Sequence, residues 1–291
     1  MLGPMSSRNT FFLLLTTLLF VLVGTILDRL TGRANDQFAL SFLAAALAMN
    51  GFFYLFSDKI ILAQAAARPL PLERAPRLHA MAERLAKRAR IPKPALYWTA
   101  SPLPNAFATG RDPSHAAVAV TLGLIRALDE RQAEAVLAHE IAHIKNRDTL
   151  AASILAAIAG SFAYLGRGLM PFSARGALLG GLARGVRFSL FAVLLGLAAP
   201  FAALLLKLAA SRSREFAADE EAAALIGAPG PLASALRRMD SAQESDSTPM
   251  SPGLLVLMTI SPKTGGRLAR LLRTHPPLRV RLRRLEALRR P

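Results

Sequence analysis

The chain has 291 residues, of which 53% are hydrophobic and only 19% are charged, and its mean hydropathy is +0.35. This composition is too apolar for an ordinary soluble domain, and it excludes an intrinsically disordered chain. Lys and Arg outnumber Asp and Glu by 36 to 19, a formal net charge of +17, and the absence of cysteine excludes disulfides and thiolate chemistry.

Two uncharged apolar blocks near the N-terminus, residues 11–27 and 38–56, are long enough to form membrane-spanning helices. At about 1.5 Å per residue, each spans most of a hydrocarbon core about 30 Å thick. A cleaved signal peptide is the alternative for the first block, but Asp28 and Arg29 stand where small residues are expected at a cleavage site. We therefore expect residues 1–56 to form a transmembrane hairpin.

Two weaker apolar blocks, about residues 149–170 and 188–210, are rich in Ala and Gly. Small residues suit close helix packing in lipid, so we expect a second transmembrane hairpin over residues 149–210; buried helices of a globular domain are the alternative. The flanking segments 57–148 and 211–291 each contain 14 Lys and Arg residues. The positive-inside rule places such segments on the cytoplasmic side of the membrane.

The segment that follows the first hairpin has a mixed composition and predicts a small α+β domain. Residues 77–90 place apolar side chains on one helical stripe, which predicts an amphipathic helix that ends before Pro92. Short apolar runs separated by loops with Pro and Gly predict a small antiparallel sheet, with strands at residues 95–99, 106–109 and 116–121.

A second helix is predicted from Asp129, which forms a capping box with Gln132 and precedes an HExxH motif. His139 and His143 are four residues apart, so their imidazoles project from one helix face and can converge on a single zinc ion. Glu140 lies beside that face and can reach a water molecule in the site. The alternative is a pair of surface histidines on a charged helix.

The third zinc ligand must come from a distant part of the chain. The positions where a longer motif would supply Gly and His hold Asn146 and Thr149. After the fourth apolar block, Glu215 and Asp219 share one helix face, so Glu215 can ligate zinc while Asp219 accepts the outer N–H of a ligand histidine. Two membrane crossings return the chain to the same side, where these groups can meet. A solvated acidic helix face is the alternative.

The motifs together resemble the HtpX-type membrane zinc metalloproteases, which are similar to the CAAX prenyl proteases and belong to the gluzincin group. The segments that carry the resemblance are HEIAH at 139–143, SRSREFAADEEAA at 211–223, NAFATG at 105–110, and THPP at 274–277 with the following Arg279 and Arg281. The resemblance implies one zinc ion per chain, bound by His139, His143 and Glu215, with Glu140 as the catalytic residue.

The resemblance also implies the architecture and setting of the protein. We expect an α+β, mostly helical integral membrane protein, with about four transmembrane helices and a gluzincin-like protease domain built from residues 57–148 and 211–291. The implied activity is that of an endopeptidase of the bacterial inner membrane, with its site facing the cytoplasm. Its expected substrates are unfolded or membrane polypeptides, in membrane-protein quality control.

Two further groups are candidate contacts for substrate. His275, followed by two prolines, is a candidate donor to the developing oxyanion, with a surface turn as the alternative. A predicted edge strand can pair with an extended substrate backbone, with an internal strand as the alternative. The strand residues are Asn105, Ala106, Phe107, Ala108 and Thr109.

The tail at residues 267–290 combines many arginines with recurring leucines. This pattern favours amphipathic helices at an anionic lipid surface, and we expect no nucleic-acid partner. Two other function classes remain open: a catalytically inactive membrane scaffold with the same fold, and an intramembrane site-2-type protease. Charged residues on both sides of the HExxH motif favour a site in water over one within the bilayer. Another divalent metal also remains open, although zinc suits mixed His and carboxylate ligands.

Overall fold

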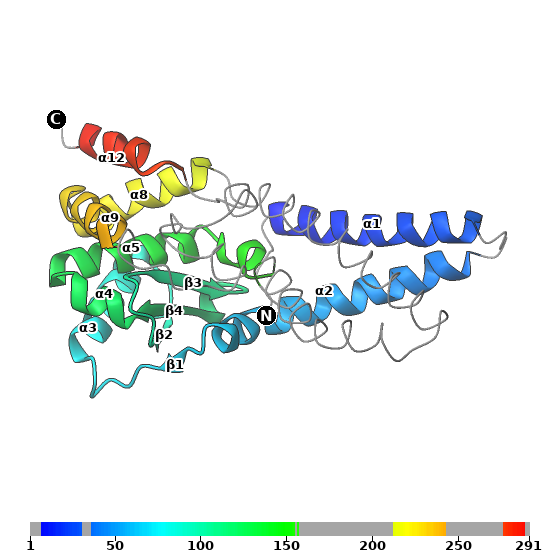
Figure 1. Cartoon of the computed structure of the whole chain (residues 1–291), viewed down its shortest axis with the longest axis horizontal. Helices are drawn as coiled ribbons and strands as arrows, with labels where there is room; N and C mark the ends of the chain where they lie inside the picture. The colour runs from blue at the N-terminus through cyan, green and yellow to red at the C-terminus, as the bar shows by residue number, and fades with distance from the viewer. Residues whose placement is uncertain (1–6, 31–35, 155, 157–211, 243–275, 289–291) are drawn as a thin grey trace, which may run out of the picture. The chain divides into compact units, whose positions relative to one another are not determined.

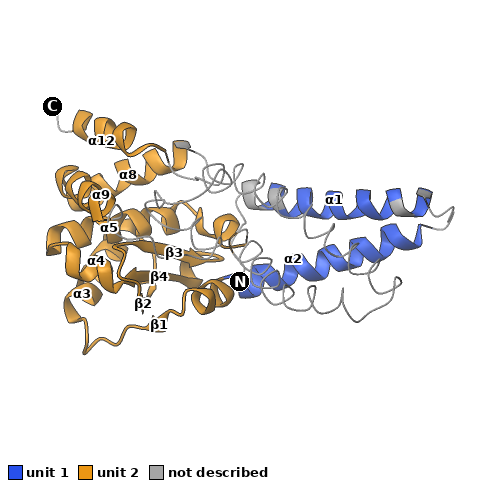
Figure 2. Ribbon diagram, in the orientation of Figure 1, with its two compact units in different colours: residues 1–57 blue, residues 58–291 orange. Residues whose placement is uncertain are grey.

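The computed structural model comprises two compact units, residues 1–57 and 58–291, which Figure 2 distinguishes by colour. The described residues are 7–30, 36–154, 156, 212–242 and 276–288. The fourth apolar block, most of the third, and His275 lie outside these ranges.

The first unit contains helix α1 (Ser7–Leu30) and most of helix α2 (Gln37–Gln64) (Figure 1). Among the described helices, α2 alone is both long and apolar enough to cross a membrane, and the apolar stretch of α1 is the shorter Leu13–Ile26. Of the four predicted membrane spans, this criterion supports one in the described part of the chain.

Polar side chains join the two apolar helices of this unit. Thr16 donates a hydrogen bond of 3.0 Å to Asn50 Oδ1, and Asn50 Nδ2 donates one of 2.9 Å to Thr17 Oγ1. Gly24 allows close approach, because a Cβ at this position would lie 2.7 Å from the Cα of Ala39. Small residues and interhelical hydrogen bonds are typical of helix pairs in lipid, where no hydrophobic force brings the helices together.

The second unit contains a four-stranded sheet in the order β1-β2-β4-β3. Its strands are β1 (Arg68–Pro69), β2 (Ala95–Thr99), β3 (Ala106–Gly110) and β4 (Ala116–Thr121). The predicted strand positions are confirmed, but the prediction of an antiparallel sheet is wrong for one pairing. β1–β2 and β3–β4 are antiparallel, whereas β2 and β4 run parallel, so the sheet is mixed.

The connection between β2 and β3 explains the parallel pairing. It carries the chain past the position of β4 to the far edge of the sheet, so that β3 and β4 form a hairpin whose second strand returns beside β2. Thr121 Oγ1 donates to the carbonyl of Leu103 at 2.7 Å and holds this connection. The connection passes so close to Gly123 that a Cβ at this position would lie 1.9 Å from the carbonyl oxygen of Pro102, so only glycine fits.

The other elements of this unit are helical, and the two helices predicted upstream of the third apolar block are confirmed. Asp129 and Gln132 form the predicted capping box at the start of the second of them. The bounds are α3 (Pro76–Ala89), a 3-10 turn (Pro113–His115), α4 (Leu122–Ala127), α5 (Glu130–Lys145), α8 (Arg212–Ile226), α9 (Gly230–Ala242) and α12 (Leu278–Ala287).

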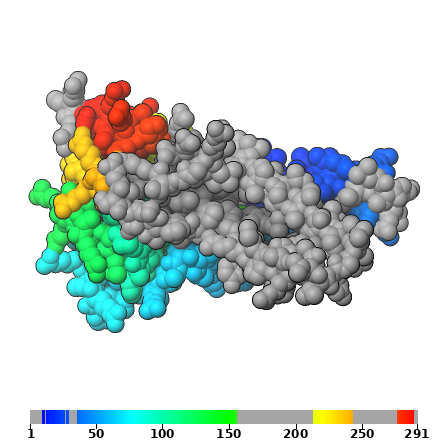
Figure 3. All heavy atoms as spheres, in the orientation of Figure 1, coloured from blue at the N-terminus to red at the C-terminus, as the bar shows by residue number. Residues whose placement is uncertain are grey.

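Helix α5 is the central element of the unit. It lies between the sheet and α8 and also contacts α3 and α9 (Figure 1). Its apolar side chains are fully buried, among them Val136, Leu137, Ile141 and Ile144. In the space-filling view, the atoms of α12 pack directly against α8 and α9 (Figure 3). Polar side chains on such a covered helix need hydrogen-bond or charge partners. The histidines and the glutamate of the HExxH motif on α5 are therefore expected to contact other polar groups.

Candidate metal centre

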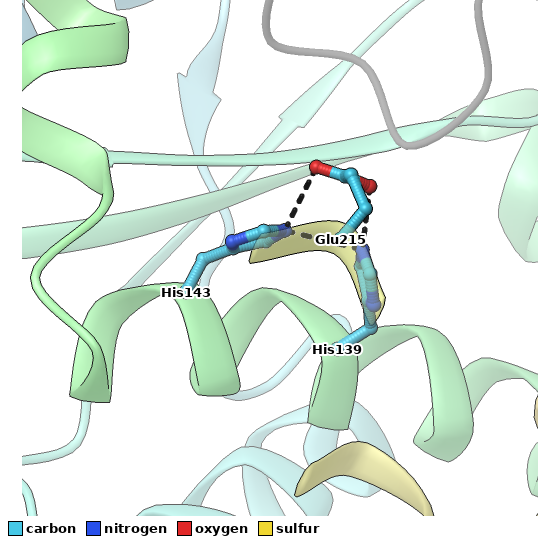
Figure 4. Close-up of side chains that lie close together, drawn as sticks. All are labelled: His139, His143 and Glu215. Carbon is cyan, nitrogen blue, oxygen red and sulfur yellow. Dashed lines mark hydrogen bonds and ion pairs between the residues drawn. The ribbon is translucent and has the colours of Figure 1, made fainter. Parts of the chain in front are cut away.

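His139 and His143 lie one turn apart on α5, and their rings converge below Glu215 (Figure 4). Their Nε2 atoms are 3.2 Å apart, and the two rings are nearly perpendicular, with an interplanar angle of 87°. The His139 side chain is completely buried, whereas that of His143 is 15% exposed. Both Nε2 atoms therefore border the same small volume.

Glu215 reaches this volume from the first turn of α8, which packs against α5. Its Oε1 lies 3.5 Å from His143 Nε2, and its Oε2 lies 3.7 Å from His139 Nε2. The predicted set of two imidazoles and one carboxylate is thus brought together, with one ligand atom from each residue within 4.8 Å of the others.

The spacing of these three groups fits a single metal ion. In a tetrahedral site with metal–ligand distances of about 2.0–2.2 Å, neighbouring ligand atoms lie about 3.3 Å apart. The two Nε2 atoms are 3.2 Å apart, close to that value, and the two oxygens of Glu215 lie on either side of them, one 3.5 Å from His143 Nε2 and the other 3.7 Å from His139 Nε2. Two imidazole nitrogens and a carboxylate oxygen form a donor set that suits zinc, and three protein ligands leave a fourth position open for catalysis.

Asp219 lies one turn after Glu215 on α8 and contacts the other ring nitrogen of His139. Its Oδ1 is 3.1 Å from His139 Nδ1, as expected for a carboxylate that orients a ligand histidine. Burial by itself raises the pKa of a carboxyl group, but the adjacent Arg281 guanidinium outweighs this effect and holds the pKa of Asp219 at about 2. Asp219 is therefore ionised and accepts hydrogen bonds at any physiological pH.

Arg281, on α12, is part of the site although the sequence analysis gave it no role. Its side chain is 2% exposed, its Nη1 lies 3.7 Å from Glu215 Oε2, and its Nη2 lies 3.4 Å from His139 Nε2. The sequence does contain a signal for this burial. Arg281 falls on the same helical stripe as Leu278, Leu282 and Leu285, all of which pack in or against the core. An arginine within an apolar stripe needs a buried acidic partner.

Glu140 and His143 complete the charged part of the site. Glu140 is 3% exposed, and its charge acts on both His143 and Arg281. Burial by itself lowers the pKa of His143, but the hydrogen bond to Asp148 and the charges of Glu215 and Glu140 outweigh it and raise that pKa to about 9. A proton therefore competes with a metal ion for this imidazole.

The predicted substrate strand, β3, lies at the edge of the described sheet and packs against α5. The bond from Thr121 N to Asn105 O establishes which residues face β4, so that Ala106, Ala108 and Gly110 point their backbone groups away from it. At Gly110 these groups are already bonded to the Ser153 and Thr149 hydroxyls.

Ala108 differs from its two neighbours on that edge. The N–H of Ala106 bonds the side chain of Asn105, but Ala108 makes no hydrogen bond to a described residue outside the β-ladder. Ala108 is 6% exposed, and among the described residues its outward N–H and C=O have no other partner.

Comparisons with known proteins agree with this geometry. The model of peptidase family M48 matches residues 72–289. A protein named Protease HtpX homolog from Sulfurihydrogenibium sp. (strain YO3AOP1) is 44% identical over 280 residues, which cover 93% of this chain and 91% of that protein. One of the same name from Aquifex aeolicus (strain VF5) is 44% identical over 245 residues, covering 81% of this chain and 80% of its own.

A solved structure is also similar. The crystal structure of S. mikatae Ste24p has a TM-score of 0.48 and 20% sequence identity to this chain, and the match covers 97% of this chain and 67% of Ste24p.

Proposed function

Since this chain belongs to peptidase family M48 and is a membrane-bound metalloprotease, we propose that it hydrolyses internal peptide bonds with one zinc ion held by His139, His143 and Glu215. The observation that supports this most strongly is the convergence of two imidazoles and a carboxylate, from helices far apart in sequence, with one ligand atom from each residue within 4.8 Å of the others. Glu140, buried beside them, provides the general base.

Each of these side chains has a distinct task in the proposed reaction. When bound, zinc supplies a Lewis acid that polarises the scissile carbonyl and acidifies water. Glu140 accepts the proton of the attacking water and delivers it to the leaving amine. Asp219 holds the ring proton of His139 on Nδ1, which leaves Nε2 free to bind the metal. His275 remains the predicted donor to the oxyanion.

We further propose that the substrate backbone adds to the edge of β3 that faces away from β4, with Ala108 as the central pairing position. Pairing through backbone hydrogen bonds depends little on the side chains of the substrate, which suits a protease of unfolded or membrane polypeptides. The hydroxyls of Thr149 and Ser153 already hydrogen-bond the backbone C=O and N–H of Gly110, so the paired part of the substrate is expected to end before Gly110. This arrangement is consistent with the predicted role in membrane-protein quality control.

The proposed setting is the bacterial inner membrane, with α2 as one of its spans and the site facing the cytoplasm. The exposed Arg279 and Arg283 of α12 are available to an anionic lipid surface. Two other arginines of α12 have protein partners instead. Arg281 bonds Asp219, and Arg284 lies 4.0 Å from the centre of the Phe216 ring.

The direct test is cleavage of casein by the purified full chain in detergent, with and without a zinc chelator. We expect wild-type activity that the chelator abolishes and added zinc restores. Glu140→Gln should remove cleavage while leaving the zinc content unchanged, because only the base is lost. Glu134→Gln, a partly exposed glutamate on the same helix that pairs with Arg84, is the matched control and should retain activity. Full activity of Glu140→Gln would overturn the assignment, and inactive wild-type protein with bound zinc would indicate a scaffold.

A further inference from the structure

Helix α5 ends in a left-handed turn directly beside the second histidine. Arg147 adopts a left-handed conformation with φ of 56°, although it is not a glycine. Its N–H bonds the carbonyl of Ile144, and the N–H of Asp148 bonds the carbonyl of His143, both at 3.0 Å. These two bonds define a Schellman motif, in which the left-handed position is usually taken by glycine.

The Schellman motif brings the side chain of Asp148 back over the last turn of the helix. In this motif the second residue after the cap commonly makes an apolar contact with the residue five positions earlier, which here is His143. A carboxylate and an imidazole replace that apolar contact, with Asp148 Oδ2 3.5 Å from His143 Nδ1. Arg90 ends α3 in the same left-handed conformation, with φ of 59°, so the feature particular to α5 is the contact of the Asp148 carboxylate with a histidine.

We propose that Asp148 is a positioning residue that keeps the ring proton of His143 on Nδ1 and so directs Nε2 toward the metal. This inference rests on the proposed function. A neutral imidazole that binds a metal through Nε2 carries its proton on Nδ1, and that proton needs an acceptor. Among the described residues, Asp148 is the acceptor that Nδ1 of His143 contacts.

The arrangement around His143 matches the one around His139. Each histidine presents Nε2 to the shared volume and Nδ1 to an aspartate, Asp219 in one case and Asp148 in the other. Each aspartate also lies near a mostly buried arginine, since Arg214 Nη1 is 3.8 Å from Asp148 Oδ1.

The ion pair between Arg214 and Asp148 also connects Asp148 to the helix that carries Glu215. Arg214 precedes the third proposed ligand, Glu215, on α8, so the ion pair links the end of the histidine helix to the helix that supplies the carboxylate. Asp148 therefore acts on two of the three ligands, directly on His143 and through Arg214 on the position of Glu215.

The test compares Asp148→Leu with Asp148→Asn in the full chain. Leucine restores the apolar contact usual in this motif, so it should fold, but it cannot accept a hydrogen bond; asparagine can. We expect the zinc affinity, measured by competition with a chelator, to fall by about 10- to 100-fold for Asp148→Leu. It should fall by only a few-fold for Asp148→Asn. The absorption bands of the cobalt(II)-substituted protein should shift in the leucine variant and remain close to wild type in the asparagine variant.

Arg147→Gly is the matched control for the loop, because glycine retains the left-handed turn without its strain. It should keep wild-type zinc affinity and unfold at an equal or higher temperature. Asp148→Ala serves as the second non-accepting variant if leucine prevents folding. Wild-type zinc affinity and cobalt spectrum in a folded non-accepting variant would overturn the role of Asp148. Zinc binding without cleavage by the wild type would instead overturn the proposed function, and the affinity difference would still decide this inference.

Discussion

Arg281 donates two hydrogen bonds to the carboxylate of Asp219, from Nε to Oδ2 at 2.8 Å and from Nη2 to Oδ1 at 2.6 Å. The two residues come from different helices, and each is 2% exposed. Two parallel bonds fix the plane of the carboxylate as well as its position. Since the same carboxylate contacts Nδ1 of His139, α12 helps to set the orientation of a proposed metal ligand on α5.

Replacing Arg281 by Met should destabilise the fold and weaken metal binding together. The substitution leaves Asp219 buried without its main cationic partner, which costs about 3–5 kcal/mol in comparable cases. Denaturant unfolding of the full chain measures the loss. The double variant Arg281→Met, Asp219→Leu should recover part of the stability, because no charge is left unpaired, while the zinc affinity stays low. Unchanged stability in the single variant would contradict the structural role given to this pair.

Zinc affinity should depend on pH because a proton must leave His143 before the metal binds. With a pKa of about 9 in the metal-free protein, His143 is protonated at pH 7. The apparent affinity should therefore rise by about tenfold per pH unit between pH 7 and 9 for the release of one proton, and then level off. Calorimetry in buffers of different ionisation enthalpy measures the released proton directly. A flat affinity between pH 7 and 9 would show that this imidazole is already neutral.

The same raised pKa gives the opposite trend for the stability of the metal-free protein. The folded-state value of about 9 exceeds the ordinary value of 6.5, so the folded state holds the proton more tightly. The stabilisation is complete below about pH 6.5 and is lost as the pH rises through 9. Asp219 has the opposite effect on the pH dependence of stability, because its pKa is depressed from 3.8 to about 2. Its contribution to the free energy of unfolding is present above about pH 4 and is lost as the pH falls through 2.

Ala108→Pro tests the proposed pairing of substrate with β3. Proline removes an N–H that points away from β4, so the β-ladder should survive and the unfolding temperature should change little. A peptide substrate would lose one backbone hydrogen bond, and kcat/KM should fall by about tenfold, corresponding to about 1.4 kcal/mol. Phe107→Pro is the contrasting variant, because its N–H faces β4 and its loss should destabilise the sheet. Unchanged kcat/KM in a folded Ala108→Pro variant would place the substrate elsewhere.

Local patterns in the sequence predicted the elements that carry the site. The capping box at Asp129 and the HExxH spacing depend on residues three or four positions apart, and α5 has the predicted geometry. The pairing of β2 with β4 could not be predicted in the same way. It depends on a connection that passes Gly123, and this contact is between residues distant in the chain.

For two residues near the proposed ligands, Arg281 and Asp148, the sequence did not predict a role in the site, for different physical reasons. Arg281 lies in a tail with many arginines, so its place on an apolar stripe was hidden by its charged neighbours. Asp148 belongs to a Schellman motif whose left-handed position holds Arg147 in place of glycine, and glycine is the residue by which such a turn is recognised. For both residues, the sequence gives the position in the chain but does not show which side chain the residue contacts.

The metal content of the purified full chain, measured by elemental analysis for wild type and for Glu215→Ala, tests the proposed metal centre most directly. We expect one zinc ion per wild-type chain and loss of most of it in the variant, since two imidazoles alone bind zinc weakly. Glu220→Ala, on the same helix with its side chain 53% exposed, is the matched control and should keep the ion. A Glu215→Ala protein that retains one zinc per chain as tightly as wild type would contradict the proposed metal centre.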